Sequence, residues 1–316
     1  MQELFKSLTE EIKKHDTIYL MAHRNIDLDA FGSLLCMYEI IMSFNKEAYI
    51  IMNKEVNSSV SKAISKVENI NYKYSNRNID ENALLIVIDT HKKEMVEIPS
   101  LIDKVKNVIV LDHHIKDTDY IKNTIISYIN SSLSSTVEIM INYLKYLNKV
   151  INPMISTIML AGLEIDTNNF NIKTTDKTYE IAASLYKLGA DGLIKNELLK
   201  ENKEEYFKRQ KLIESAKMIS DNIALCVFDD DSYSKEALAI VATDLLQFEN
   251  VEVGLALGKL KNGNIGISAK SLGDINVEDL MKKLGGGGHF NNAATEIKDK
   301  TKKEVEKMLI SAIKEW

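Results

Sequence analysis

The stretch that most constrains the fold is a short apolar run that ends in three polar residues, Asp112, His113 and His114. The run, residues 108–111, is rich in β-branched side chains, which is typical of a buried strand in a parallel sheet. Open α/β sheets hold their ligand sites just beyond the carboxyl ends of such strands. The sequence therefore predicts an α/β fold with a polar site at this strand end.

Three further apolar segments end in the same manner. They are residues 18–22, leading to His23, Asp27 and Asp29; residues 84–88, leading to Asp89, Thr90 and His91; and residues 159–163, leading to Asp166. A single copy could be a helix cap followed by surface histidines. Four copies are hard to explain by packing, because a carboxylate at the end of a buried element is costly unless something compensates its charge. A bound divalent metal does so.

Composition narrows the class of protein. A chain of 316 residues favours two domains. The formal net charge of -6 argues against binding of long nucleic acid, although small nucleotides held through metals remain open. Two cysteines, Cys36 and Cys226, lie in apolar contexts and are expected to be buried thiols of a cytoplasmic protein. We find no apolar run long enough to cross a bilayer, and residues 1–14 are typical of an amphipathic helix rather than a signal peptide.

Strands and helices alternate up to residue 111, which predicts a parallel sheet. Helices dominate from Ser134, where residues 134–138 resemble a capping box. Residues 201–220 are strongly charged and are expected to form one exposed connecting helix. A second, smaller α/β unit follows, with a hairpin across Asn262 and Gly263. We therefore expect a metal-binding catalytic domain in residues 1–190, a helical linker in 191–222 and a substrate-binding domain in 223–316.

The polar residues at the strand ends are suited to binding metal ions. Asp27 and Asp29 are two positions apart and can address two different ions, beside His23 on the same loop. Asp89 could bridge the two ions, and His113 and Asp166 would complete the ligands of the second ion. Carboxylate and imidazole donors without thiolate suit Mn²⁺ and related divalent ions. A pair of such ions is the usual arrangement for hydrolysis of phosphoesters.

A run of glycines provides a separate signal. Gly285, Gly286, Gly287 and Gly288 precede His289. Such residues can leave backbone N–H groups free to surround a phosphate, and His289 could bind a phosphate oxygen. A flexible loop with a surface histidine is the alternative. That alternative loses ground when a two-metal site for phosphoesters is predicted in the same chain.

The four motifs in this order resemble those of the DHH phosphoesterases, and the glycine run with His289 resembles their DHH-associated substrate-binding domain. The resemblance covers nearly the whole chain and implies a role for each residue. One Mn²⁺ would be bound by His23, Asp27 and Asp89, and the other by Asp29, Asp89, His113 and Asp166. Asp112 would orient a ligand and His114 would face the substrate phosphate, which makes Asp89, Asp112, His113 and His114 the catalytic set. Gly286, Gly287, Gly288 and His289 would hold the nucleotide. Ile26 departs from the family, where proline is common.

Three segments resemble most the catalytic module of membrane-anchored cyclic di-AMP phosphodiesterases: residues 89–92, 162–170 and 289–295. The resemblance implies a Mn²⁺-dependent phosphodiesterase that opens cyclic di-AMP to linear pApA. It also implies homodimers and, for an excised module, a place at the cytoplasmic face of the membrane. The alternative is a phosphodiesterase of very short oligonucleotides or pApA, or a phosphatase of phosphoadenosine phosphate, with the same metal ligands. A nucleotide sensor with a decayed centre and a pyrophosphatase are less favoured. Phe290 and Tyr233 are candidates for stacking on adenine.

Overall fold

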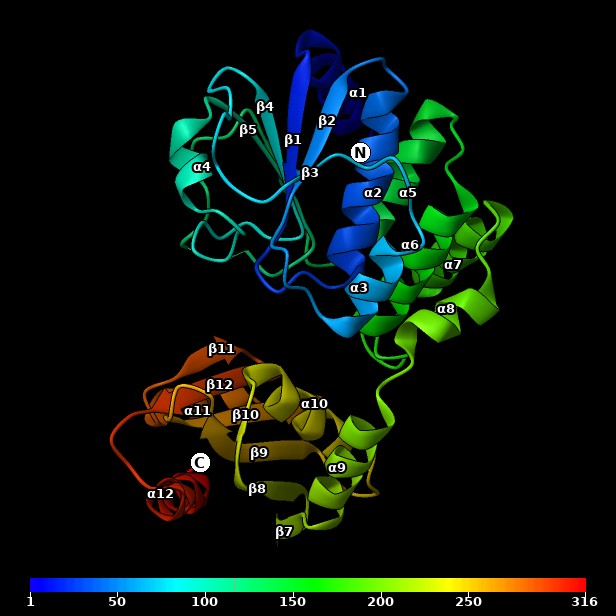
Figure 1. The fold of residues 1–316 in the computed structure, drawn as a ribbon. Coiled ribbons are helices and arrows are strands. Elements are labelled where there is room, and N and C mark those ends of the chain that lie inside the picture. Colours follow the sequence, from blue (N-terminus) through cyan, green and yellow to red (C-terminus); the bar gives the residue numbers. More distant parts are fainter. Residues whose placement is uncertain (117) are drawn as a thin grey trace. The chain divides into compact units, whose positions relative to one another are not determined.

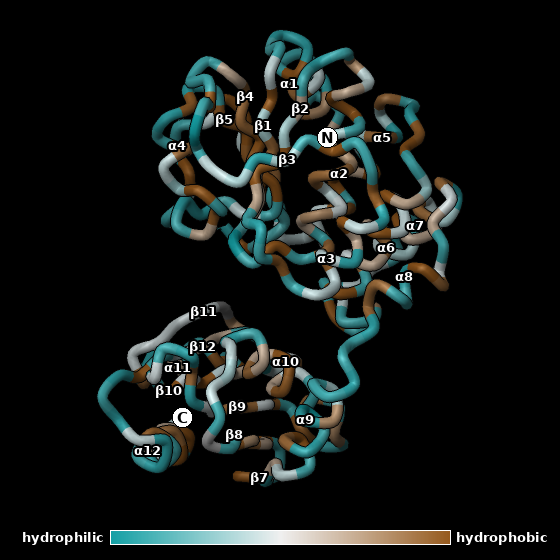
Figure 2. The backbone as a smooth tube through the Cα atoms, viewed as in Figure 1, coloured by the Kyte–Doolittle hydropathy of each residue, from teal (hydrophilic) through white to brown (hydrophobic). Residues whose placement is uncertain are grey.

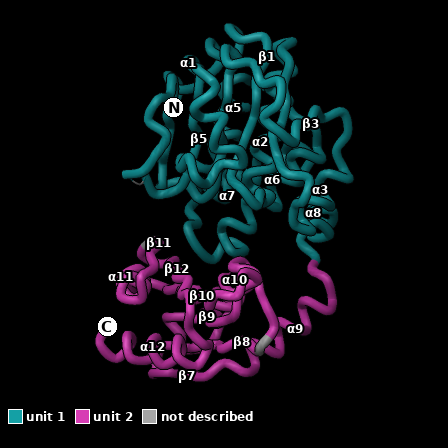
Figure 3. The backbone as a smooth tube through the Cα atoms, turned by 60° about the vertical axis from the view of Figure 1, so that its left-hand side comes forward, with its two compact units in different colours: residues 1–200 teal, residues 201–316 magenta. Residues whose placement is uncertain are grey.

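The computed structural model describes residues 1–116 and 118–316, without the side chains of residues 230 and 289. The chain divides into two compact units, residues 1–200 and residues 201–316 (Figure 3). Each unit has a six-stranded sheet with helices packed on it. The α/β fold class predicted from the sequence is therefore confirmed.

The sheet of unit 1 has the strand order β3-β2-β1-β4-β5-β6, and every described pairing in it is parallel. Its strands are β1 (Thr17–Met21), β2 (Glu47–Ile51), β3 (Tyr72–Lys73), β4 (Leu84–Ile88), β5 (Asn107–Asp112) and β6 (Ile126–Ile129). The parallel sheet and its central strands were predicted. The edge strands β3 and β6 were not, because they are short and only half-buried and so lack a continuous apolar run.

Helices cover one face of this sheet in two layers (Figure 1). The helices of unit 1 are α1 (Gln2–Lys14), α2 (Leu28–Met42), α3 (Ser58–Ile64), α4 (Ser100–Lys104), α5 (Thr136–Leu147), α6 (Pro153–Asp166), α7 (Asp176–Lys187) and α8 (Gly192–Leu199). Helices α1, α2 and α5 contact the sheet, while α6 packs on α2 and α7 packs on α5. The short α4 and loops around Ile79 and Val96 cover the opposite face.

The carboxyl ends of three central strands lie at the same level. Met21 of β1 pairs with Val87 of β4, and Val87 pairs with Val110 of β5. The chain adds β2 and β3 on one side of β1 and places β4, β5 and β6 on the other. This change of direction between β1 and β4 is the position at which doubly wound sheets bind ligands. The central strands are apolar, and many of the loops that join them are hydrophilic (Figure 2).

The sheet of unit 2 is mixed, with the order β11-β12-β10-β9-β8-β7. The pairing of β8 with β9 is parallel, and the other described pairings are antiparallel. Its elements are α9 (Lys203–Glu214), β7 (Lys217–Ser220), β8 (Ile223–Tyr233), α10 (Lys235–Leu245), β9 (Val253–Leu260), β10 (Ile265–Ser271), α11 (Val277–Lys283), β11 (Gly287–His289), β12 (Asn292–Ile297) and α12 (Lys302–Lys314). The predicted β9–β10 hairpin is confirmed, and Gly263 in its turn has a positive φ of 89°.

The single exposed helix predicted for residues 201–220 is wrong. Helix α9 ends at Glu214 and buries Leu212 in a core cluster of unit 2. Residues Lys217–Ser220 then form β7, which pairs antiparallel with β8. The high charge of the segment hid both features, because Leu212, Ile213 and Ile219 are its main apolar anchors. Among the described residues, no helix combines the length and hydropathy that crossing a bilayer requires.

Candidate metal centre

The loop after β1 places His23 and Asp27 side by side. Asp27 is the N-cap of α2, since its Oδ1 accepts a hydrogen bond from the N–H of Ala30 at 3.0 Å. Its other oxygen, Oδ2, lies 3.7 Å from Nε2 of His23. Asp27 therefore caps a helix with one oxygen and presents the other to the site.

The same loop is held in place without a proline. Ile26 stands where the resembling family commonly has proline, and its side chain is buried in the core of unit 1. The preceding Asn25 has a positive φ of 55°, a conformation that asparagine tolerates better than most residues. Asn57 donates from Nδ2 to the carbonyl oxygen of Ile26 at 2.9 Å. Burial and this hydrogen bond thus replace the stiffness that a proline ring would give.

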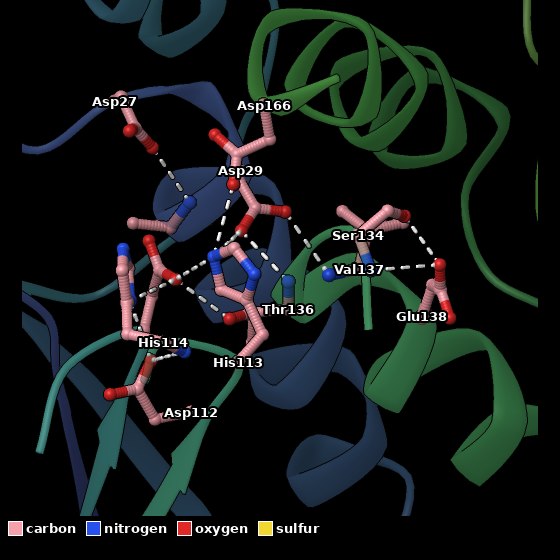
Figure 4. Close-up of polar contacts among 12 residues, drawn as sticks. Asp27, Asp29, Asp112, His113, His114, Ser134, Thr136, Val137, Glu138 and Asp166 are labelled. Atoms are coloured by element: carbon pink, nitrogen blue, oxygen red, sulfur yellow. Dashed lines mark hydrogen bonds and ion pairs between the residues drawn. The ribbon is translucent and has the colours of Figure 1, made fainter. Parts of the chain in front are cut away.

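Asp29 lies in the first turn of α2 and is fully buried. Its two oxygens accept hydrogen bonds from the first backbone N–H groups of α5. Oδ2 accepts from Thr136 at 2.9 Å, and Oδ1 accepts from Val137 at 3.1 Å. The positive end of a helix stabilises a carboxylate in this position. Asp29 therefore joins α2 to the start of α5 and lies beside the site (Figure 4).

Asp166 reaches the site because α6 passes very close to α2. A Cβ atom placed on Gly162 would lie 2.6 Å from the backbone N and Cα of Asp29, closer than any real side chain. Gly162 is one helical turn before Asp166, the last residue of α6. The carboxylate of Asp166 lies 3.0 Å from Nε2 of His113. The absence of a side chain at Gly162 is thus what allows Asp29 and Asp166 to approach the same imidazole.

Asp89 occupies the centre of the cluster. It follows β4 directly and has a positive φ of 64°, which is uncommon for a residue other than glycine. Its Oδ2 lies 3.4 Å from Nε2 of His23, and its Oδ1 lies 3.3 Å from Nε2 of His113. The hydroxyl of Thr136 donates to the same Oδ1 at 2.7 Å. The two oxygens of Asp89 therefore face two different groups of side chains.

Three overlapping groups of these residues could each hold a metal ion. They are His23 with Asp27 and Asp89; Asp29 with His113 and Asp166; and Asp89 with His113 and His114. Within each group the candidate ligand atoms lie within 4.8 Å of one another. Nε2 of His113 is buried and, among the described residues, makes no hydrogen bond although it faces carboxylates. A lone pair on this nitrogen aimed at carboxylate oxygens fits a divalent cation between them, so the donor set suits Mn²⁺.

Asp112 lies behind these groups and is fully buried. Its Oδ1 accepts from the backbone N–H of His114 at 3.1 Å and from the Nδ1 of the same residue at 2.8 Å. Its Oδ2 accepts from Nδ1 of His91. The carboxylate of Asp112 thus fixes the ring of His114, which remains 43% exposed on its outer side. This geometry suits an orienting role for Asp112 and a substrate-facing role for His114.

The pKa values show how crowded the charges are. Burial, reinforced by the charges of Asp166 and Asp89, raises the pKa of Asp29 well above its usual range. Burial would lower the pKa of His23, but the carboxylates of Asp27 and Asp89 outweigh burial and raise that pKa to about 12. Burial would raise the pKa of Asp89, but the neighbouring imidazoles of His113 and His23 outweigh burial and hold that pKa well below its usual range. The buried carboxylates thus need positive charge nearby, and bound divalent cations would supply it.

Part of the glycine run in unit 2 forms a strand, which the sequence analysis did not predict. Gly287 and Gly288 belong to β11, which pairs with Ala294 and Ala293 of β12. A Cβ atom at Gly286 would lie 2.3 Å from the carbonyl oxygen of Ala294, and one at Gly288 would lie 2.5 Å from Cα of Ala293. Packing therefore explains two of these glycines. A Cβ atom at Gly287 would meet nothing within 4 Å, so space is left there for a ligand. The side chain of His289 lies outside the described residues.

Two contributors were missed from the sequence. His91 was noted at a strand end, but its contact with Asp112 was not foreseen. Residues 134–138 were predicted to open a helix through a capping box; the helix α5 is confirmed, but the capping-box hydrogen bonds are not formed. Ser135 is the N-cap and makes no side-chain cap, while Glu138 accepts from the N–H of Ser134 at 3.1 Å. The first N–H groups of α5 donate to Asp29 instead. Thr136 and Asp29 are 107 positions apart in the sequence, so no local pattern shows this contact.

Two family models match the chain. The DHH family, N-terminal domain, matches residues 17–163, and the DHHA1 domain matches residues 220–316. The chain is 34% identical over 320 residues to the cyclic-di-AMP phosphodiesterase PdeA of Listeria monocytogenes, covering 98% of this chain and 49% of that protein. It is 28% identical over 310 residues to the bifunctional oligoribonuclease and PAP phosphatase NrnA of Mycoplasma genitalium, covering 93% of each. The chain thus spans about half the length of PdeA.

The fold is also shared with a solved structure. An exopolyphosphatase-related protein from Bacteroides fragilis superposes with a TM-score of 0.84 at 19% identity, covering 99% of this chain and 97% of that protein. At this level of identity the match concerns the fold. It shows that the two sheets and their helices form an architecture already seen in an experimental structure.

Proposed function

Because this chain belongs to the DHH family, we propose that it is a Mn²⁺-dependent phosphodiesterase that hydrolyses cyclic di-AMP to linear pApA. The observation that carries the proposal is the position of Asp89, with one oxygen toward His23 and the other toward His113. A carboxylate shared in this way suits two ions bound side by side. The similarity to PdeA over 98% of the chain supports the cyclic substrate.

Each residue of the site would have a separate role in the reaction. His23, Asp27 and Asp89 would hold one ion, and the second would be held by Asp29, Asp89, His113 and Asp166. Two such ions would activate a water molecule and clamp the attacking and leaving oxygens of a phosphodiester. Asp112 holds the Nδ1–H of His114, so Nε2 of that ring is the atom presented to a substrate phosphate. Water adds to one phosphorus and one P–O3′ bond breaks, which opens the ring to pApA.

The proposal extends to unit 2 and to the cell. Gly286, Gly287, Gly288 and His289 would hold the nucleotide, with Gly287 supplying the open space noted above. Cys36 and Cys226 are free and buried, as expected for a protein in a reducing compartment, and we propose that the chain acts in the cytoplasm or at the cytoplasmic face of the membrane.

A second candidate is hydrolysis of short linear oligonucleotides or of phosphoadenosine phosphate. The observation that favours it is the similarity to NrnA, which is 28% identical to this chain over 310 residues. Every proposed metal ligand serves both reactions, so the two candidates differ only in the substrate. A nucleotide sensor without activity is disfavoured because its ligand positions would have no reason to converge.

Product analysis separates these candidates. The chain is incubated with Mn²⁺ and cyclic di-AMP, and in parallel with pApA, and the products are resolved by chromatography. We expect cyclic di-AMP to become pApA while pApA is left largely intact, and we expect Asp89→Ala to be inactive. Rapid conversion of pApA to AMP with cyclic di-AMP untouched would favour the second candidate. Turnover retained in Asp89→Ala would overturn the metal-centre assignment.

A further inference from the structure

We infer that Thr136 is a positioning residue, whose hydroxyl divides the two oxygens of Asp89 between the two metal positions. The inference rests on the proposed two-metal function. It concerns a side chain that lies 47 residues from Asp89 in the sequence and that had been assigned only to a helix start. Its consequence is that the bridging geometry depends on a neutral hydroxyl as well as on the ligands.

A buried hydrogen bond joins Thr136 to Asp89. Thr136 is fully buried and Asp89 is nearly so. The hydroxyl Oγ1 lies 2.7 Å from Oδ1 of Asp89, a normal distance for a strong hydrogen bond to a carboxylate. An ionised carboxylate can only accept, so Thr136 is the donor. A buried hydrogen bond to a charged group fixes the carboxylate more firmly than a solvent-exposed one would.

The carboxylate of Asp89 needs such a partner to fix its orientation. The terminal torsion of an aspartate is broad, so its backbone does not by itself decide which oxygen faces which neighbour. Oδ1 faces His113 and Oδ2 faces His23, at 3.3 Å and 3.4 Å. Rotation of the carboxylate would exchange or merge these contacts. The hydroxyl of Thr136 fixes Oδ1 on the His113 side and thereby leaves Oδ2 for the His23 side.

Thr136 is itself held in place by Asp29. Its own N–H donates to Oδ2 of Asp29 at 2.9 Å, next to the bond from Val137. One residue thus contacts two carboxylates that come from different elements, Asp29 in α2 and Asp89 after β4. The start of α5 therefore sets the spacing of two proposed ligands (Figure 4). A threonine that merely begins a helix would need neither contact.

Thr136→Val and Thr136→Ser distinguish positioning from packing. Valine keeps the shape and the backbone N–H but removes the hydroxyl, whereas serine keeps the hydroxyl and removes a methyl group. Ser135→Ala is the matched control, because Ser135 is the neighbouring buried residue and its hydroxyl has no hydrogen-bond partner among the described residues. Thermal unfolding of each metal-free variant checks that it is folded. If Thr136→Val is unfolded, Thr136→Ala takes its place with the same expected result.

The measurement is a titration of the full metal-free chain with Mn²⁺, followed by calorimetry and by electron paramagnetic resonance. Wild type, Thr136→Ser and Ser135→Ala are expected to bind two ions with the spectrum of a spin-coupled pair. Thr136→Val is expected to bind the second ion about 10- to 100-fold more weakly, as when other orienting partners are lost, and to show uncoupled Mn²⁺. A coupled pair of unchanged affinity in Thr136→Val would overturn the inference, as would equal losses in Thr136→Val and Ser135→Ala.

The readout needs no substrate, so it is separate from the test of the reaction. A coupled pair in both wild type and Thr136→Val would reject the role of Thr136 and leave the proposed function standing. A coupled pair lost only in Thr136→Val, with cyclic di-AMP untouched, would support the role of Thr136 and reject the proposed substrate. No pair in wild type would reject both.

Discussion

The two sheets of this chain gather candidate residues in different ways. In unit 1 the described strands of the sheet all pair in parallel, so the carboxyl ends of β1, β4 and β5 meet at one edge. The residues that follow these ends, such as His23, Asp89 and His113, come together there. In unit 2 most pairings are antiparallel, and the candidate residues come from one hairpin, β11 with β12. A parallel sheet can thus build a site from distant segments, whereas the hairpin offers a local surface for a ligand.

The two units also differ in where they keep charge. In unit 1, Asp29, Asp89 and Asp112 are buried to 2% exposure or less, against imidazoles and helix α5. In unit 2, the ion pair of Lys235 with Glu296 leaves both side chains partly exposed. Buried carboxylates require strong compensation, while surface pairs do not. Buried carboxylates of this kind are what the proposed metal centre in unit 1 would require.

The largest effect is expected from Asp89→Asn. Partners that merely orient a ligand cost about 10- to 100-fold in metal affinity or activity when lost, so loss of the shared ligand is expected to reduce turnover by about 10³-fold. Turnover of cyclic di-AMP under saturating Mn²⁺ measures this. Asp244→Asn is the control from unit 2, since Asp244 is a partly buried carboxylate paired with Arg209, and it should keep full activity. Equal losses in both variants would contradict the division between the units.

Next in size is Gly162→Ala in α6. The added Cβ would lie 2.6 Å from the backbone of Asp29, so α6 must move and carry Asp166 away, at a cost of about 1–3 kcal/mol in stability. Mn²⁺ stoichiometry and thermal unfolding measure the two effects. Gly32→Ala at the same helix pair, with a Cβ 3.0 Å from Cα of Met159, should separate the helices less and should weaken Mn²⁺ binding less than Gly162→Ala does. Unchanged metal binding in Gly162→Ala would show that the close approach does not matter.

In unit 2, Gly288→Ala should change stability, whereas Gly287→Ala should change the KM for the nucleotide. Gly288 faces the backbone of β12, so its alanine variant should lose about 1–3 kcal/mol of stability. Gly287 faces open space, so its variant should fold with unfolding free energy changed by less than about 0.5 kcal/mol. The KM for the nucleotide in Gly287→Ala should nevertheless rise several-fold. Wild-type KM in a folded Gly287→Ala would remove the ligand role of this position.

The smallest effect concerns Glu296 in β12. Hydrogen bonds with Lys235, Asn264 and Asn262 lower the pKa of Glu296 from 4.5 to about 2. Because the folded pKa is depressed, the stabilisation is present above pH 4.5 and is lost as the pH falls toward 2. The group is at the surface and screened by solvent, so about 0.5 kcal/mol is expected. Glu296→Gln should remove this pH dependence in denaturant unfolding curves, and an unchanged acid limb would contradict it.

Much of unit 1 could be predicted from the sequence because its signals are local. Each central strand is a continuous apolar run, and each proposed ligand follows such a run or lies at a helix end. Edge strands such as β3 and β6 gave no such signal, since one face of each is not covered. The roles of Thr136 and His91 depend on which elements are neighbours in space. The local pattern of residues 134–138 instead indicated a capping box, because Glu138 lies at the position that a capping box requires.

The measurement that most directly tests this account is anomalous diffraction at the manganese edge from crystals of the chain grown with Mn²⁺. We predict two peaks about 3.5–4 Å apart at the carboxyl edge of the parallel sheet. One should lie beside His23 and Asp27, the other beside His113 and Asp166, with the carboxylate of Asp89 between them. A single peak, or a pair that Asp89 does not bridge, would contradict the account.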